Sequence, residues 1–207
     1  MKFRLTFVFL ILGIALAVLG GKGLVTSVLP AKDLYDPNVD WSKLKSGQRV
    51  YVEIDYIWDA FEETTNDSGS SVSRLYALPD IQAGNDGYYI AHFIGVTVPS
   101  KEYYDFEKLN SDSIAWEQGE YDQLGERGYI TFDGYLKKMG KEEQGFLRDY
   151  LRDNNYTDSE IDDMIIPLSM VRNQALLTNV LMFAGGILLT IVGAIFGFVF
   201  FLKKPNV

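Results

Sequence analysis

Four carboxylates around the end of one predicted strand are the side chains best placed for chemistry. They are Asp55, Asp59, Glu62 and Glu63. Paired carboxylates can cleave glycosidic bonds, and they can ligate a hard cation such as Ca²⁺. A charged strand edge that resists aggregation has the same composition. Both interpretations stay open at this point, and we expect the solvated edge.

His92 is the only histidine, and the chain has no cysteine. A zinc site built on His and Cys is therefore excluded, as are a thiolate nucleophile and a disulfide. A Ser-His-Asp triad would have to use His92. In the predicted strand 88–98, His92 lies on the same face as Ile90, Ile94 and Val96. We therefore expect a structural histidine on an apolar strand face.

Asp153 begins a stretch that resembles a calcium-binding loop. Its sixth position is Asp158 instead of glycine and its twelfth is Met164 instead of glutamate, so the sharp turn and the bidentate ligand are missing. Thr157 to Glu160 instead fits a capping box that opens a short helix. The sequence contains no phosphate-binding loop, dinucleotide motif, nucleophile elbow or zinc-protease motif, so we predict no cofactor and no metal.

Aromatic residues are numerous, with 13 Tyr, 13 Phe and 3 Trp. The residues that could line a groove for a glycan or a peptide are Tyr51, Trp58, Tyr103, Tyr104 and Trp116. Packing in the core and at interfaces would use the same residue types, and we expect that use for most of them.

The elements that would position these residues lie between positions 30 and 172. Predicted strands are 48–56, 74–78, 88–98 and 128–136. We predict one helix that starts after Ser100 as its N-cap, a second over 141–153 and a short third one after Thr157. The stretches 62–73 and 111–127 are predicted loops. Residues 165–170 are predicted to be a short strand or a connection to the second apolar segment. We therefore expect an α+β domain, an antiparallel-rich sheet with two or three helices, flanked by two transmembrane helices.

Two apolar segments, 5–29 and 176–202, flank this domain. At about 1.5 Å per residue the second reaches roughly 40 Å, more than the ~30 Å of a bilayer core, so we predict a transmembrane helix. The first has a basic start and a short apolar run, which also describes a cleaved signal peptide. Its apolar character resumes after Lys22 and it lacks a clean cleavage site, so we expect an uncleaved anchor.

Charge sets the expected orientation. Lys2 and Arg4 precede the first segment and Lys203 and Lys204 follow the second. Because positive flanks stay inside, the ends 1–4 and 203–207 are predicted to be cytoplasmic and the domain to lie outside. All 28 acidic residues fall in that domain, which argues against nucleic acid as a partner.

Small residues recur at helical spacing in both apolar segments. They are Gly13, Ala17, Gly21, Gly186, Gly193 and Gly197. Such faces allow close helix contact, either between the two segments or in a homodimer. Glycine is also frequent in transmembrane helices, so the spacing has a second explanation.

One succession of segments resembles a pattern in uncharacterised two-pass membrane proteins of Gram-positive bacteria. It consists of Gly134-Tyr-Leu-Lys-Lys-Met139, then an acidic amphipathic helix, then Ile166-Pro167. The block from Tyr88 to Leu109 is similar as well. The resemblance implies a bacterial origin and uncleaved anchors, and it implies no assigned activity or functional residues.

We therefore expect a membrane-anchored protein of the cell envelope whose extracytoplasmic domain binds a membrane or envelope protein. Two alternatives remain open. One is a surface hydrolase that acts on envelope glycan or peptide through carboxylates, and the other is an accessory subunit of a transporter complex.

Overall fold

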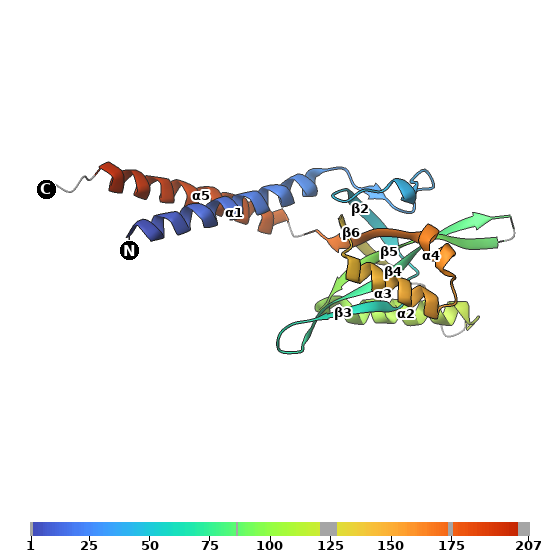
Figure 1. The fold of residues 1–207 in the computed structure, drawn as a ribbon. Helices are drawn as coiled ribbons and strands as arrows, with labels where there is room; N and C mark the ends of the chain where they lie inside the picture. The colour runs from blue at the N-terminus through green and yellow to red at the C-terminus, as the bar shows by residue number, and fades with distance from the viewer. Residues whose placement is uncertain (1, 86, 121–127, 174–175, 203–207) are drawn as a thin grey trace. The chain divides into compact units, whose positions relative to one another are not determined.

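The computed structural model of the chain describes residues 2–85, 87–120, 128–173 and 176–202 (Figure 1). They belong to two compact units. Unit 1 combines residues 1–29 with 173–207, and unit 2 comprises 30–172. The predicted basic flank Lys203-Lys204 lies outside the described residues.

Unit 1 holds two long apolar helices, α1 (Lys2–Val28) and α5 (Leu176–Leu202), of 27 residues each. Their segments Thr6–Val28 and Thr178–Val199 are long and apolar enough to cross a membrane by length and composition. Large apolar side chains point outward on both helices; Phe7 and Phe198, for example, are exposed.

Unit 2 is built on a seven-stranded mixed sheet with the order β1-β2-β6-β7-β5-β4-β3. The strands are β1 (Lys32–Asp33), β2 (Arg49–Ile54), β3 (Ala60–Thr65), β4 (Ser71–Gly84), β5 (Gly87–Pro99), β6 (Ile130–Lys138) and β7 (Ile165–Arg172). The α+β class is confirmed, but the sheet is mixed because β1 and β2, and β5 and β7, pair in parallel. A parallel pair needs a long crossover connection, and the chain between β5 and β7 supplies one, because it contains three α-helices and β6.

Three helices belong to unit 2: α2 (Tyr103–Glu117), α3 (Lys141–Asp153) and α4 (Asp158–Met164). The described residues thus contain five α-helices in all, these three in unit 2 and the apolar helices α1 and α5 in unit 1. Ser100 opens a short 3₁₀ turn, Ser100–Glu102, and does not cap α2. Positions 111–117 of the predicted loop 111–127 are instead the second half of α2, where buried Ser113 donates a hydrogen bond to the Leu109 carbonyl (2.9 Å). Positions 121–127 of that loop lie outside the described residues.

Two hydrophobic clusters cover opposite faces of the sheet. On one face Phe106 of α2 packs with Val52 and Ile94. On the other, Phe93 packs with Leu147 of α3, and α4 contributes to the same cluster. Because neighbouring residues of β5 point to opposite faces, one strand feeds both clusters and fixes helices on either side.

The hairpin of β4 and β5 is longer than its sequence indicates. Residues 62–65, which we predicted as part of a loop, form the end of β3. Strand β4 is 14 residues long and continues past Pro79 to Gly84. A register shift follows Asp80, where Asp80 pairs with His92 and Ile81 with Ile90. The extra residue of β5 turns Ile90 away from the face of His92 and Ile94, and Ile90 packs at the cluster around Phe93 instead.

Candidate functional site

One depression on unit 2 is a groove of about 470 Å³ beside the β4–β5 hairpin. We call it the aromatic groove. It is lined by Tyr35, Asp55, Tyr56, Pro79, Ile81, Tyr88, Tyr89, Ile90 and Trp116. These residues come from five separate segments: the turn after β1, the segment after β2, both hairpin strands and the last turn of α2. Its volume falls in the range of small-molecule sites.

One wall of the groove is an aromatic pair held by a carboxylate. The rings of Tyr56 and Trp116 meet edge to face, with centroids 6.0 Å apart. The Tyr56 hydroxyl donates to Glu117, next to Trp116, and accepts from the Trp58 indole N–H at 2.8 Å. Burial, followed by the hydrogen bond to Glu117, raises the pKa of Tyr56, so the phenol stays protonated at neutral pH.

The part of the lining that the hairpin supplies is fixed by a chain of hydrogen bonds between its two strands. Tyr89 donates from its hydroxyl to Gln82 Oε1 (3.1 Å), and Gln82 Nε2 donates to Asp80 Oδ2 (3.0 Å). His92 Nδ1 lies 2.9 Å from the same Asp80 oxygen. Asp80 is 7% exposed, so the network anchors the tyrosine ring to a buried group. Tyr88, the preceding residue, also lines the groove and is 80% exposed.

The four carboxylates predicted as a cluster are divided between two places. Asp55 lines the aromatic groove, whereas Asp59, Glu62 and Glu63 line a second depression together with Arg74. Neither depression therefore contains both Asp55 and Asp59. Asp59 accepts a hydrogen bond from the backbone N–H of the next residue (2.7 Å), as in an ordinary turn.

Glu62 and Glu63 are neighbours whose pKa values are shifted in opposite directions. Burial, with smaller contributions from Glu143 and Glu142, raises the pKa of Glu62, and its Oε2 is buried without a hydrogen-bond partner. A hydrogen bond from Ser71, followed by the effect of Arg74, lowers the pKa of Glu63. The pair alternates along β3, so one carboxylate faces the protein and the other faces solvent.

The predicted aromatic set contributes only Trp116 to the aromatic groove. Trp58 packs on Phe93 in the core, with ring centroids 5.1 Å apart. Tyr103 is hydrogen-bonded to Ser71, and Tyr51 to Glu53 on its own strand. The doublet Tyr88-Tyr89 was the sequence signal for the groove, because two aromatics beside a hairpin turn have little core to enter.

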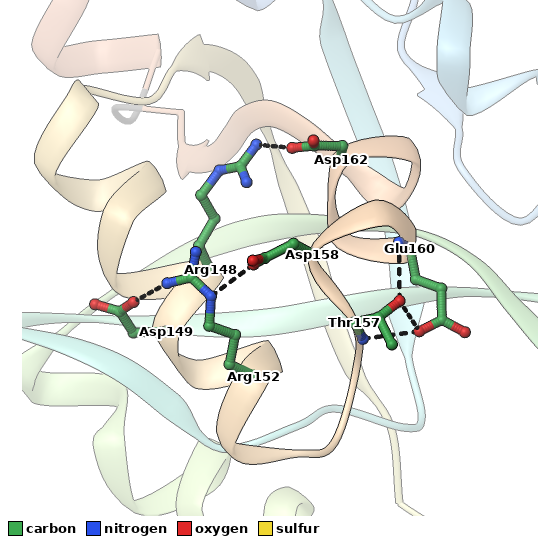
Figure 2. Close-up of polar contacts among 7 residues, drawn as sticks. All are labelled: Arg148, Asp149, Arg152, Thr157, Asp158, Glu160 and Asp162. Atoms are coloured by element: carbon green, nitrogen blue, oxygen red, sulfur yellow. Dashed lines mark hydrogen bonds and ion pairs between the residues drawn. The ribbon is translucent and has the colours of Figure 1, made fainter.

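The region that resembles a calcium loop is a helix connection (Figure 2). Thr157 N donates to Glu160 Oε2 at 2.8 Å and Thr157 Oγ1 accepts from Glu160 N at 3.4 Å, which confirms the capping box. Arg152 bridges Asp149 on its own helix and Asp158 on α4, and Arg148 pairs with Asp162. Among the described residues, no group of three His, Cys, Asp or Glu could hold a metal ion.

In unit 1 the small residues lie in the contact between α1 and α5. A Cβ on Gly13 would fall 2.5 Å from Thr190 Oγ1, and one on Gly186 would fall 2.3 Å from the backbone nitrogen of Ala17. Both distances are shorter than side-chain carbon atoms tolerate, so the two backbones approach closely only because these positions are glycine.

The remaining small residues are less uniform. A Cβ on Gly193 would lie 3.1 Å from the nearest atom of α1, and one on Gly197 would lie 3.3 Å from Thr6 Cγ2. Gly21 has room for ordinary contact at 3.4 Å, whereas its neighbour Gly20, which spacing did not single out, would bring a Cβ within 2.4 Å of α5.

Fold and groove together define an α+β domain carried between two apolar helices, with one aromatic depression on its surface. The chain belongs to a family described as a domain of unknown function (DUF8577), whose model matches residues 2–203. No curated protein matches the chain, and no solved structure matches it. Since the family description gives no activity, a functional proposal has to rest on the residues themselves.

Proposed function

We propose that this protein is a two-pass membrane protein whose unit 2 binds a membrane or envelope protein on the outer side of a bacterial membrane. The observation that carries the proposal is the combination of two apolar, outward-exposed helices with an exposed aromatic groove on unit 2. Tethering at both ends keeps unit 2 near the membrane surface, which suits a partner in the same envelope.

The groove supports a binding role because tyrosine and tryptophan are the residues that dominate protein recognition. Tyr88 and Tyr89 are exposed, while the hydrogen bonds of Tyr56 and Tyr89 hold two rings in place before any partner arrives. Rings that are already ordered lose less conformational entropy on binding.

No specific observation supports either alternative function. A carboxylate hydrolase needs two acids in one cleft, and Asp55 and Asp59 line different depressions. A transporter subunit that docks through its glycines would need them on an open face, and Gly13 and Gly186 already face the partner helix within unit 1.

Topology is testable with single cysteines, because the chain has none of its own. Ser68→Cys, at the exposed turn between β3 and β4, should react with a membrane-impermeant maleimide on intact cells. A cysteine added after Val207 should react only after permeabilisation. The reverse pattern, or loss of the protein from membranes at alkaline pH, would overturn the placement.

Partner binding is testable by site-specific photocrosslinking in native membranes. A photoreactive phenylalanine at Tyr88, 80% exposed on the groove, should give a discrete adduct. The matched control is Tyr104, which is 77% exposed on α2 and does not line the groove. Equal adducts from both positions, or none from Tyr88, would contradict a role for the groove.

A further inference from the structure

Strand β3 is the last of the described strands on one side of the sheet, because the strand order ends with β4 and then β3. It pairs antiparallel with β4, from Ala60 opposite Tyr76 to Thr65 opposite Ser71. In such a pair, about half of the backbone N–H and C=O groups of the edge strand point away from its neighbour. β3 therefore directs a row of backbone donors and acceptors toward the side where a further strand would pair.

A depression of about 330 Å³ spans this edge of the sheet. In its lining, Ala60 packs against the cluster that contains Phe106, whereas Phe61 packs against the cluster that contains Leu147. These clusters cover opposite faces of the sheet, so a depression lined by both residues crosses the strand from one face to the other. We call it the β3 edge groove. It shares no lining residue with the aromatic groove.

The β3 edge groove carries an excess of negative charge. Asp59, Glu62 and Glu63 belong to the lining that the structure describes, and Arg74 is the one basic residue in it. Arg74 is already shared between two carboxylates, because it forms ion pairs with Glu63 and with Glu107 of α2. One guanidinium therefore leaves the groove acidic.

The first turn of α3 adds further negative charge on the other face. Burial, followed by the charges of Glu143 and Glu142, raises the pKa of Glu62, and Lys137 offsets only part of this. Glu62 Oε2 is also buried without a hydrogen-bond partner among the described residues. Because an unsatisfied buried oxygen is costly, a cationic donor from a partner would stabilise this side chain.

Charge distinguishes between the segments that could pair with β3. A second copy of this chain would bring Glu62 and Glu63 of one β3 against the same carboxylates of the other, and like charges directly opposite each other destabilise a sheet. A segment with two consecutive basic residues would match the two carboxylates, which point to opposite faces of the strand. The whole of unit 2 favours such a segment as well, since residues 30–172 contain all 28 acidic but only 14 of the 19 basic residues.

We propose that β3 accepts an extended basic segment of a partner protein, which pairs with it as a further strand of the sheet. Backbone hydrogen bonds along β3 hold the segment, and its Lys or Arg side chains lie against Glu62 on one face and Glu63 on the other. β3 has six residues, so a segment of similar length is sufficient. The inference adds a second binding surface to unit 2 and does not depend on the aromatic groove.

The test uses the full chain in a neutral detergent and a set of hexapeptides, acetyl-Thr-Val-Xaa-Xaa-Val-Thr-amide, in which both Xaa are Lys, Gln or Glu. A fourth peptide keeps both lysines but carries N-methyl groups on its four central backbone nitrogens, so that it cannot donate to a neighbouring strand. Calorimetric titration measures the affinity. Hydrogen–deuterium exchange measures protection of the backbone in 59–65, with 78–84 of the β4–β5 hairpin as the internal control.

We expect the Lys peptide to bind saturably and to slow exchange in 59–65, while 78–84 is unchanged. The Gln peptide should bind roughly three- to tenfold more weakly, and the Glu peptide should not bind measurably, because its charges oppose those of β3. The N-methylated peptide should lose about tenfold or more in affinity, since its backbone hydrogen bonds are removed.

A charge reversal on the protein tests the same contact. Glu63→Lys should weaken binding of the Lys peptide roughly three- to tenfold, because an attractive pair becomes repulsive. The matched control is Asp67→Lys, which makes the same charge change in the exposed turn after β3 and outside the groove lining. This variant should bind within about twofold of the wild type, because exposed charges that are not in contact are largely screened.

Equal binding of the Lys and Glu peptides, undiminished binding of the N-methylated peptide, or slowed exchange at 78–84 with none at 59–65 would each overturn the inference. So would dimers in detergent that protect 59–65 without any peptide, because β3 would then take a second copy of the chain. The Tyr88 crosslink reports on the aromatic groove alone. Its failure would leave this inference intact, and a failure of the peptide test would leave the proposed function intact.

Discussion

Nδ1 of His92, the single histidine, lies 2.9 Å from Oδ2 of Asp80, which is almost fully buried in β4. A buried carboxylate is costly unless it is hydrogen-bonded, and His92 and Gln82 both contact the same oxygen. The pair therefore explains a polar residue in the middle of a strand that otherwise packs into the core.

Replacing His92 by alanine should destabilise unit 2 by about 1–3 kcal/mol, the usual result of removing a partner from a buried polar group. Urea unfolding followed by tryptophan fluorescence measures this, because Trp41, Trp58 and Trp116 all lie in unit 2. The double variant His92→Ala/Asp80→Ala should lose less than the sum of the two single variants. Strict additivity would show that the pair contributes nothing as a pair.

Gly185 and Gly186 are adjacent on α5 but have different surroundings. Outside its own stretch of helix, a Cβ on Gly185 would meet no atom of the described residues within 4 Å, whereas one on Gly186 would collide with α1. A disulfide between Thr6→Cys and Gly197→Cys should therefore form in the Gly185→Val background and be strongly reduced with Gly186→Val. Non-reducing electrophoresis reads the result, and equal crosslinking in both would contradict the close contact.

Glu62 should make unit 2 less stable as pH rises. Its pKa is raised in the folded protein, so between its ordinary value of 4.5 and the raised value the folded state holds a proton that the unfolded state has released. Glu62→Gln should remove this loss: the variant should match the wild type below pH 4.5 and exceed it at neutral pH.

Glu63→Gln is the matched control for that experiment, with the opposite sign. The pKa of Glu63 is lowered, so its contribution is present at neutral pH and disappears as pH falls through the lowered pKa. The Gln variant should thus be no more stable than the wild type at neutral pH. Parallel pH profiles for the two variants would show that burial does not distinguish the two carboxylates.

Thr157→Ala should cost about 1 kcal/mol, because it removes the capping side chain of α4. Arg152→Ala should cost less, about 0–1 kcal/mol, since both of its ion pairs are solvent-exposed. Urea unfolding again supplies the measurement. A larger loss for Arg152→Ala would mean that the ion pairs, rather than the cap, fix α4 against α3 (Figure 2).

Local sequence patterns predicted the elements that are defined by residues close together in the chain. Alternating apolar residues located β2 and β5, and Thr157 with Glu160 located α4. Polar residues in buried places defeated the same reasoning. The predicted strand 74–78 ended before Asp80 and the predicted loop 111–127 included Ser113, although each of these polar residues forms a hydrogen bond that allows its burial.

The groove could not be predicted because its residues are distant in sequence. Tyr35, Tyr56, Tyr88 and Trp116 meet only when the segment after β2 passes the hairpin and the end of α2. The parallel pairing of β7 with β5 is another such long-range property, because the sequence of β7 is compatible with either direction. Spacing within one helix is a local signal, and it singled out Gly13 and Gly186 but chose Gly21 where Gly20 makes the tighter approach.

The position of β7 gives the two connections to unit 1 different mechanical properties. α1 leads into β1, a two-residue strand at the edge of the sheet, while α5 follows β7, the middle strand of seven. Tension along the first connection would peel away a few hydrogen bonds and leave most of the sheet intact. Tension along the second would have to shear a strand that is bonded to β6 on one side and β5 on the other. A pull from the C-terminal helix would therefore reach the centre of unit 2, and a pull from the N-terminal helix only its rim.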